Sequence, residues 1–187
     1  MLGMTAQWMG VMGDHANSVA PLLISTEQGY FKSTFCKSLL PPVLRRYYMD
    51  KVDLTSQGHI EQRLAEMGLL NLDEFDTLSP ARMQELKSLI TQDVMNERKV
   101  YDIQNYTFIR RASFIASTNN PHCLPDIGEN RRILFNTLLE IDYHTPVNHQ
   151  GIYAQAYALY RQGFQYWYEN EEITFLNNRN EAFLQKD

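Results

Sequence analysis

The chain has 187 residues, a formal net charge of −5, and 44% hydrophobic and 21% charged side chains, a composition typical of one compact globular domain. The acidic balance, with a pI near 5.5, excludes attraction of the whole domain to nucleic acid, so DNA contacts must come from local basic loops. No signal peptide or membrane-spanning stretch is visible, which predicts a cytoplasmic protein, and Cys36 and Cys123 match no metal or redox spacing.

The first part of the chain predicts a helix, a strand and a second helix. Residues 1–18 are apolar and rich in methionine, and we expect an amphipathic helix followed by a loop. Val19–Ser25 is an apolar run with the length of a buried strand. Thr34–Leu40 is predicted to be a helix that ends at Pro41 and Pro42, because proline does not continue a helix.

The middle of the chain predicts a further helix, strand and helix. Apolar residues recur at helical spacing over Gly58–Met67, and Leu69–Leu72 is a second apolar run with the length of a strand. Ser79 is expected to cap a third helix, with Pro80 at its first position. One face of that helix is apolar: Met83, Leu86 and Ile90.

The last part of the chain completes an α/β pattern. Polar and aromatic residues over Thr91–Thr107 predict a loop or hairpin, and Ala112–Ala116 and Arg131–Leu139 predict two more strands. His149–Glu169 is predicted to be a helix with an aromatic face that packs on the core, and the alternative is a surface that binds the remainder of the protein. Apolar strands that alternate with helices indicate parallel βαβ units, and therefore a three-layer α/β fold with a mainly parallel central sheet.

The loop after the first predicted strand, TEQGYFKS, partly matches the phosphate-binding pattern G-x-x-x-x-G-K-[ST]. Lys32 and Ser33 stand at the start of the following helix, as this pattern requires for contacts with phosphates and Mg²⁺. Both glycines of the pattern are replaced, by Thr26 and Phe31, and only Gly29 supplies backbone freedom. The alternative is an ordinary exposed loop.

Polar residues also follow the next two apolar runs. After Leu69–Leu72, Asp73 is placed to hold Mg²⁺ and Glu74 to polarise the attacking water, as in P-loop ATPases. Asn119 follows the third run, where such ATPases sense the γ-phosphate. The alternatives are solvated turns.

Arg131 and Arg132 enter the fourth predicted strand and suit an arginine finger, which stabilises charge on the transferred phosphoryl group. A surface ion pair is the alternative for two arginines taken alone. The order of Lys-Ser, Asp-Glu, Asn and Arg next to successive apolar runs favours the P-loop ATPase interpretation.

Three stretches resemble the virulence-associated protein E family, primase-helicases of phages and mobile elements: EQGYFKSTF, LDEFDTLSPARMQELKSLIT and IASTNNPHCLPDIGENRR. The resemblance covers roughly 22–139. It implies a P-loop NTPase fold of the superfamily 3 helicase type within the AAA+ class, with ATP and Mg²⁺ as ligands. It also implies assembly as a homo-oligomeric ring that moves on single-stranded DNA.

The resemblance also implies roles for individual residues. Nucleotide binding falls to Gln28, Gly29, Lys32, Ser33 and Thr34, and the metal to Ser33 and Asp73. The implied catalytic residues are Lys32, Glu74, the sensor Asn119, and Arg131 or Arg132 acting on a neighbouring subunit's ATP.

Related helicases carry a pore hairpin between the second acidic motif and the sensor strand. Arg98, Lys99 and Tyr101 fall in this interval, where a basic-aromatic loop grips the DNA backbone and stacks bases. The alternative is a solvated surface loop.

We therefore expect residues 1–187 to be one P-loop ATPase domain of a larger protein. Its parts are an N-terminal helix and loop (1–18), an ATPase core (19–140) and a C-terminal helical part (141–187). One alternative is a non-hydrolysing P-loop scaffold for nucleic-acid binding or assembly, which the missing glycines favour. A small-molecule phosphotransferase is the other, although it needs neither the asparagine nor the arginine pair.

Overall fold

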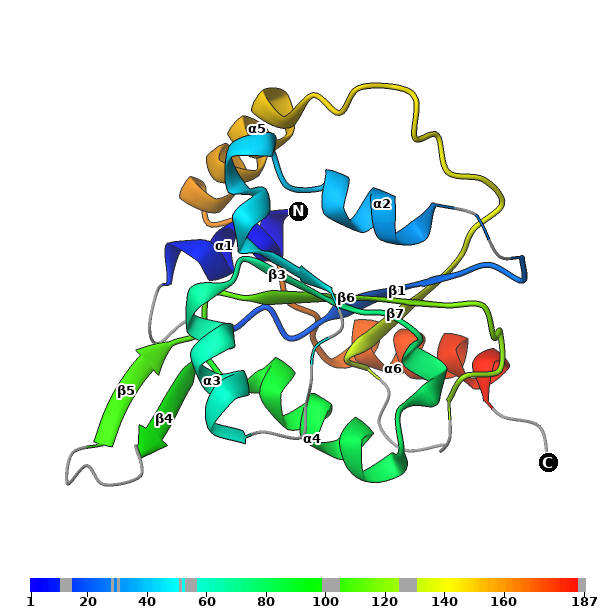
Figure 1. Ribbon diagram of the computed structural model, residues 1–187, viewed down its shortest axis with the longest axis horizontal. Coiled ribbons are helices and arrows are strands. Elements are labelled where there is room, and N and C mark those ends of the chain that lie inside the picture. The colour runs from blue at the N-terminus through cyan, green and yellow to red at the C-terminus, as the bar shows by residue number, and fades with distance from the viewer. Residues whose placement is uncertain are drawn as a thin grey trace.

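The structure is a computed structural model that describes residues 1–10, 15–27, 29, 31–50, 52, 57–98, 105–124 and 131–184. Figure 1 shows the arrangement of its elements. The helices are α1 (Leu2–Met9), α2 (Lys32–Ser38), α3 (Gln57–Glu66), α4 (Pro80–Thr91), α5 (His149–Arg161) and α6 (Asn170–Asn180), with 3₁₀ turns η1 (Pro42–Tyr47), η2 (Phe75–Thr77) and η3 (Glu181–Phe183). The strands are β1 (Ala20–Ile24), β2 (Tyr48–Asp50), β3 (Leu69–Leu72), β4 (Val94–Arg98), β5 (Asn105–Ile109), β6 (Ser113–Thr118) and β7 (Ile133–Thr137).

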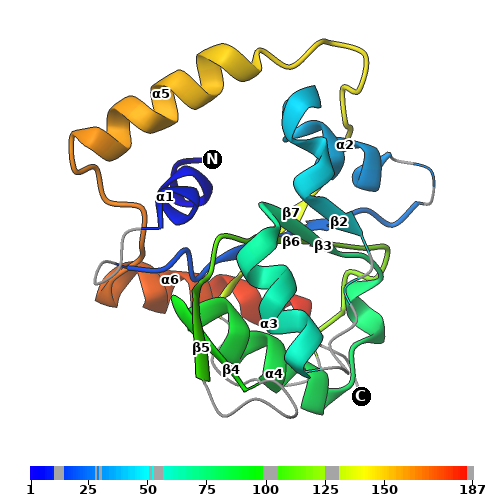
Figure 2. The same cartoon turned by 60° about the vertical axis from the view of Figure 1, so that its left-hand side comes forward.

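The central sheet has the strand order β2-β3-β6-β1-β7, and every neighbouring pair is parallel. Helices α1, α2 and α5 lie on one face of this sheet, and α3, α4 and α6 lie on the other (Figures 1 and 2). The predicted three-layer α/β fold with a parallel sheet is therefore confirmed. Strands β4 and β5 form a separate antiparallel hairpin, which was one of the two structures expected for Thr91–Thr107.

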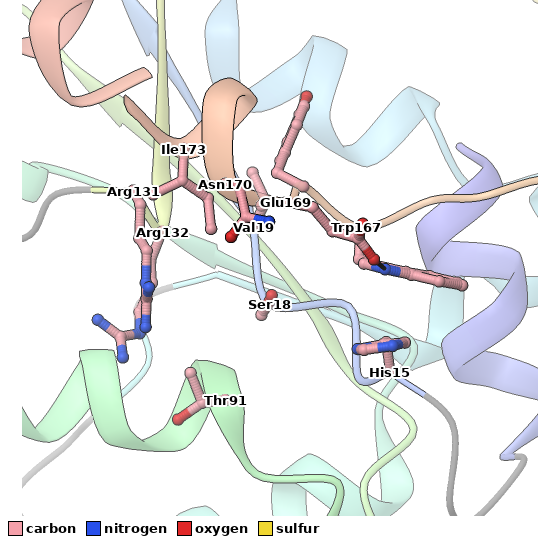
Figure 3. Close-up of a pocket in the computed structure, with 11 residues that line it drawn as sticks. His15, Ser18, Val19, Thr91, Arg131, Arg132, Trp167, Glu169, Asn170 and Ile173 are labelled. Carbon is pink, nitrogen blue, oxygen red and sulfur yellow. Dashed lines mark hydrogen bonds between the residues drawn. The ribbon is translucent and has the colours of Figure 1, made fainter. Parts of the chain in front are cut away.

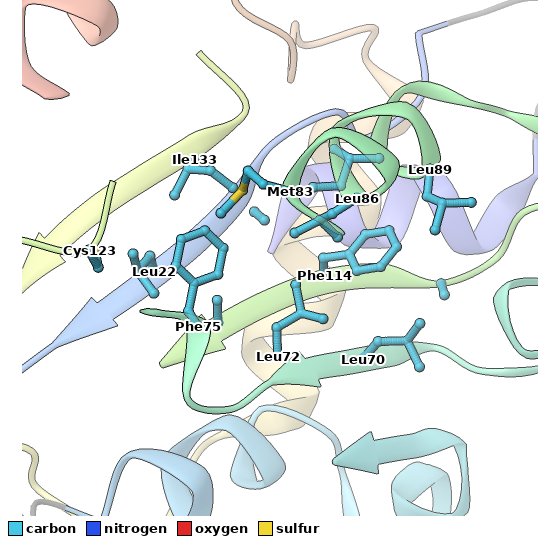
Figure 4. Close-up of a cluster of buried hydrophobic side chains, with 14 of the residues drawn as sticks. Leu22, Leu70, Leu72, Phe75, Met83, Leu86, Leu89, Phe114, Cys123 and Ile133 are labelled. Carbon is cyan, nitrogen blue, oxygen red and sulfur yellow. The ribbon is translucent and has the colours of Figure 1, made fainter. Parts of the chain in front are cut away.

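The inner strands β1, β3 and β6 are mostly apolar because both faces of the sheet are covered. In β1, Leu22 and Ile24 point into the larger core beneath α3 and α4, whereas Leu23 points into the smaller core beneath α1, α2 and α5. Phe114 and Ile115 of β6 divide between the two cores in the same way. Figure 4 shows the larger core, in which side chains of α4 pack on β1, β3 and β6.

The helix predicted over His149–Glu169 is wrong beyond Arg161. Gly163 adopts a left-handed conformation (φ 72°), and the amide of Phe164 bonds to the carbonyl of Leu159, which together end α5. A new helix, α6, then begins behind a capping box at Glu169. Part of the aromatic set that was expected to pack on the core is exposed, both within α5 (Tyr157, 42%) and beyond its end (Phe164, 60%, and Tyr168, 37%).

Arg110, to which no role was assigned from the sequence, lies between β5 and β6 and is fully buried. Its guanidinium group donates to oxygen atoms from four parts of the chain: Gln7 Oε1, the Asn17 carbonyl, the Ile90 and Gln92 carbonyls, and the Ala112 carbonyl. Burial lowers the pKa of Arg110 to about 10, while Asp93 opposes that shift. Arg110 therefore joins α1 and the C-terminal end of α4 to the residue that precedes β6 in the central sheet.

Replacing this cation should destabilise the fold. Arg110→Met leaves several buried carbonyl oxygens without their donor, and we expect the free energy of unfolding to fall by about 3 kcal/mol or more. Urea unfolding measures this change. Arg63→Met is the matched control, because the Arg63 side chain is about half exposed and pairs with Glu66 at the surface, and it should cost less than about 0.5 kcal/mol. Equal losses in the two variants would show that Arg110 has no special role.

Candidate functional site

The carboxyl ends of β3, β6 and β1 lie next to one another in the sheet. In open parallel sheets, ligands bind in the crevice outside these ends. The polar residues predicted from the sequence follow the three strands: Asp73 and Glu74 after β3, Asn119 after β6, and the loop before Lys32 after β1. The topology thus places these chemical groups together at the carboxyl ends of the strands, which we call the carboxyl edge of the sheet.

Lys32 is the first residue of α2 and reaches across the ends of β1 and β6. Its Nζ donates to Ser25 Oγ (2.6 Å) and to Asn119 Oδ1 (2.5 Å). Burial lowers the pKa of Lys32, and the nearby Asp73 carboxylate partly opposes this shift. Among the described residues the hydrogen-bond partners of this partly desolvated ammonium are neutral oxygen atoms, so the group is well suited to receive an anionic ligand.

The acidic residues after β3 are held by hydroxyl groups at the end of β6. Ser117 Oγ donates to Asp73 Oδ1 (2.6 Å), and Thr118 Oγ1 donates to Asp76 Oδ1 (2.5 Å). Thr118 Oγ1 also accepts from the Asn120 amide (3.0 Å), which fixes the backbone on the far side of Asn119. Asp76 therefore orients the turn that presents Asn119 to Lys32.

Sequence reasoning missed Ser25, Ser117 and Asp76 as parts of this network. A usable signal was present, because hydroxyl residues end β1 and β6 and would have to face something polar at the shared edge. It could be interpreted only once the strand order was known.

The expected metal ligands fit Mg²⁺ in their chemistry. Ser33 lies in the first turn of α2 and is half-buried, like Asp73, and Mg²⁺ prefers oxygen ligands of these kinds. In the described part of the chain, no group of three or more His, Cys, Asp or Glu side chains could hold a metal by itself. A bound Mg²⁺ would thus need phosphate and water oxygens to complete its shell, as is usual for this ion.

Two non-glycine residues at the site have left-handed backbones. Phe31, which directly precedes Lys32, has a φ of 53°, and Glu74 has a φ of 54°. Gly29 has a φ of 87°, and a side chain there would meet open space. Such conformations cost a residue with a Cβ about 1 kcal/mol, and they gather at functional sites. Phe31 therefore has a positive φ at the position where the phosphate-binding pattern has a glycine. Glu74 and Thr34 are exposed.

A second polar network joins β2 to β3. Asp50 Oδ1 accepts from the Tyr48 hydroxyl (2.6 Å) and from Asn71 Nδ2 (2.9 Å). Burial and the Asp50 carboxylate both raise the pKa of Tyr48. Burial, and then Asp50 and Asp73, raise the pKa of the Cys36 thiol to about 12. The Tyr48 hydroxyl and the Cys36 thiol therefore stay protonated at neutral pH, and both side chains pack between α2 and the strands β2 and β3.

Arg131 and Arg132 lie just before β7, at the amino ends of the strands, whereas Lys32 lies at the carboxyl ends. The Arg132 carbonyl accepts from the Ala20 amide at the start of β1 (2.8 Å). Both arginines line a pocket of about 360 Å³, with His15 stacked on Trp167 (4.0 Å) in the same pocket (Figure 3). They are therefore not brought together with Lys32 within this chain.

Four predicted site residues are not placed. Gln28, Lys99 and Tyr101 lie outside the described residues, and of Arg98 only the backbone at the end of β4 is described. The hairpin that carries Arg98 is confirmed, whereas its contact with DNA stays a prediction. None of the helices in the described part of the chain has the length and apolar character needed to cross a lipid bilayer.

A family model described as the virulence-associated protein E-like domain matches residues 16–185. Similar solved structures include the apo structure of the NrS-1 C-terminal region (305–718), 16% identical, with a TM-score of 0.53 over 95% of this chain and 47% of that one. The A form apo structure of the same region is also 16% identical, with a TM-score of 0.50 over 97% of this chain and 46% of that one. At this identity the likeness shows the fold alone, and the chain spans about half the length of either match. A search of curated proteins found no match.

The backbone strain at Phe31 can be measured by two substitutions. Phe31→Ala and Phe31→Gly both remove the aromatic ring, but only glycine relieves the left-handed conformation. We expect the glycine variant to be the more stable by about 1 kcal/mol in urea unfolding, the reverse of the usual order for these residues in helices. An alanine variant of equal or higher stability would contradict a strained loop.

Proposed function

The chain belongs to the virulence-associated protein E-like domain family, and on this basis we propose that it is the ATP-binding and ATP-hydrolysing motor domain of a phage or mobile-element DNA helicase or primase-helicase. The observation that carries the proposal is the contact of Lys32 Nζ with Asn119 and Ser25 across the carboxyl ends of β1 and β6. It supports a phosphate site, because it combines a partly desolvated ammonium with a polar residue placed for the terminal phosphate.

Binding would begin with Lys32. On arrival of ATP, its ammonium exchanges the neutral oxygens of Ser25 and Asn119 for phosphate oxygens, which carry charge and bind it more strongly. Ser33 and Asp73 would hold Mg²⁺, whose role is to neutralise charge on the phosphate oxygens. Ser117 keeps the Asp73 carboxylate in place through its 2.6 Å hydrogen bond.

Hydrolysis would use Glu74 and Asn119. Glu74 orients a water molecule and accepts its proton as the water oxygen bonds to the γ-phosphorus; the bond to the bridging oxygen breaks, and ADP leaves with its electron pair. Asn119, freed from Lys32, bonds to the γ-phosphate or the attacking water. Asp76 contributes indirectly by holding Thr118 and the turn that bears Asn119.

Arg131 and Arg132 would act on a neighbouring subunit. They precede β7 at the amino edge of the sheet, whereas Lys32 lies at the carboxyl edge. The five-residue strand β1 between these edges spans about 16 Å. A head-to-tail ring brings the amino edge of one subunit to the carboxyl edge of the next. The ring, its single-stranded DNA, and the cytoplasmic location all remain predictions.

A non-hydrolysing P-loop scaffold is the second candidate function. Phe31 favours it, because its ring stands where the phosphate-binding pattern has a glycine and lies 4.0 Å from the ring of Tyr143. The hydrogen-bonded Asp73 and Asn119 favour hydrolysis instead, since a scaffold needs neither group to be oriented.

ATP hydrolysis by the 187-residue chain, with and without single-stranded DNA, tests the first proposal. We expect DNA to stimulate phosphate release and Lys32→Ala to lower it by about a hundredfold or more. Lys37→Ala is the matched control, because Lys37 is an exposed lysine of the same helix, and it should retain activity. ATP binding without hydrolysis, in correctly folded and assembled protein, would move the assignment to the scaffold.

Mixing two inactive variants tests whether the arginines act between subunits. Lys32→Ala protein is mixed with the double variant Arg131→Ala and Arg132→Ala. In a head-to-tail ring, some interfaces then pair an intact lysine with intact arginines, so a random equal mixture should recover about a quarter of the wild-type rate. A mixture that stays inactive although subunits exchange would show that the arginines do not complete a neighbour's site.

A further inference from the structure

Three aromatic side chains form a column beside the phosphate loop. The ring of Phe31 lies 4.0 Å from that of Tyr143, and the ring of Tyr143 lies 4.0 Å from that of His144, measured between centroids. All three residues are exposed, Phe31 by 47% and Tyr143 by 46%. We call Phe31, Tyr143 and His144 the aromatic column. Large aromatic surface left open in this way is characteristic of binding sites rather than cores.

The two residues contributed by the segment after β7 are held in a defined turn. Asp142 Oδ1 accepts from the amides of His144 and Thr145 (3.0 Å each), and Asp142 Oδ2 accepts from Thr145 Oγ1 (2.5 Å). These hydrogen bonds lower the pKa of Asp142, so the turn keeps them at neutral pH. The column is therefore built from two fixed pieces of backbone, this turn and the strained residue before Lys32.

The strand order puts the column at a particular end of the bound nucleotide. Strand β1 lies between β6 on one side and β7 on the other. The terminal phosphate belongs on the β6 side, beside Asn119 and Asp73, so the nucleoside end of the molecule extends toward the β7 side. The segment after β7 leaves the sheet there, where the Leu138 amide bonds to the Ile24 carbonyl (2.7 Å), and it carries Tyr143 and His144.

We infer that the aromatic column is the stacking surface for the base of the nucleoside triphosphate whose phosphates bind Lys32. This inference rests on the proposed function. Stacking on an aromatic side chain suits any nucleobase, because every base has a π-face. It also gives the Phe31 ring a role that its backbone strain and its half-exposed position do not otherwise explain.

The test compares ATP with inorganic tripolyphosphate, which has the phosphates but no base. Affinities of both for the 187-residue chain are measured by calorimetry with Mg²⁺. Tyr143→Ala should weaken ATP binding by about fivefold or more and leave tripolyphosphate binding unchanged. Tyr143→Phe keeps the ring and should bind both ligands as the wild type does. Tyr157→Ala removes an equally exposed tyrosine from α5 and should change neither affinity.

Tyr143 is the middle ring of the column, and a second variant tests the end next to Lys32. Phe31→Leu keeps an apolar side chain but removes the π-face, and it should also weaken ATP more than tripolyphosphate. Binding of an oligothymidine is measured on the same variants. If both variants leave the ratio of the ATP and tripolyphosphate affinities unchanged, the base does not stack on the column and the inference fails, although phosphate binding stands. The same holds if the variants weaken only the binding of the oligothymidine. If the wild-type chain binds neither ATP nor tripolyphosphate, the proposed function fails and the inference fails with it.

Discussion

The position of β6 between β1 and β3 is the constraint on which the site depends. It brings the ends of three parallel strands into neighbouring places, although the residues that follow them are far apart in the sequence. The bond from Lys32 to Asn119 crosses from β1 to β6, and the bond from Ser117 to Asp73 crosses from β6 to β3. If β6 were placed elsewhere in the sheet, both bonds would be lost, and the lysine and the acidic pair would face different surroundings.

Helix α2 is the element through which this edge is connected to the rest of the domain. Lys32 fixes its first turn, and α5 fixes its last: His149 Nε2 lies 2.6 Å from the Ser38 carbonyl, and the Tyr153 hydroxyl donates to the Leu39 carbonyl (2.7 Å). Tyr153 also stacks on Trp8 of α1. These contacts connect α2 to α5 and α1, which lie on the same face of the sheet. Arg110 holds α1 from the other side through Gln7.

The sequence predicted the parts of the fold that depend on continuous burial. Leu69–Leu72 and the run in β6 were recognisable because a strand covered on both faces is mostly apolar along its length, instead of alternating apolar and polar residues. Strand β2 (Tyr48–Asp50) was missed since it has three residues, of which two are partly buried and one is exposed, and forms no apolar run. The end of α5 was missed because the signal, Gly163, was outweighed by the aromatic residues on either side of it.

The residues of the candidate site could be chosen from the sequence by their chemistry, whereas their geometry could not be predicted. Lys32, Asp73 and Asn119 could be chosen because each is a polar residue at a strand or loop end. Their partners Ser25 and Asp76 depend on strand order, and Arg110 depends on helices that meet only in three dimensions. The left-handed backbone of Phe31 was not predicted, because a phenylalanine seldom adopts it.

The most direct test of the account is a crystal structure of the chain with Mg²⁺ and a non-hydrolysable ATP analogue. We predict that the terminal phosphate lies within hydrogen-bonding distance of Lys32 Nζ and Asn119, with Lys32 released from Asn119 and the metal next to Ser33 and Asp73. An analogue bound at another place, with the contact between Lys32 and Asn119 unchanged, would contradict the central claim that this edge of the sheet is a nucleotide site.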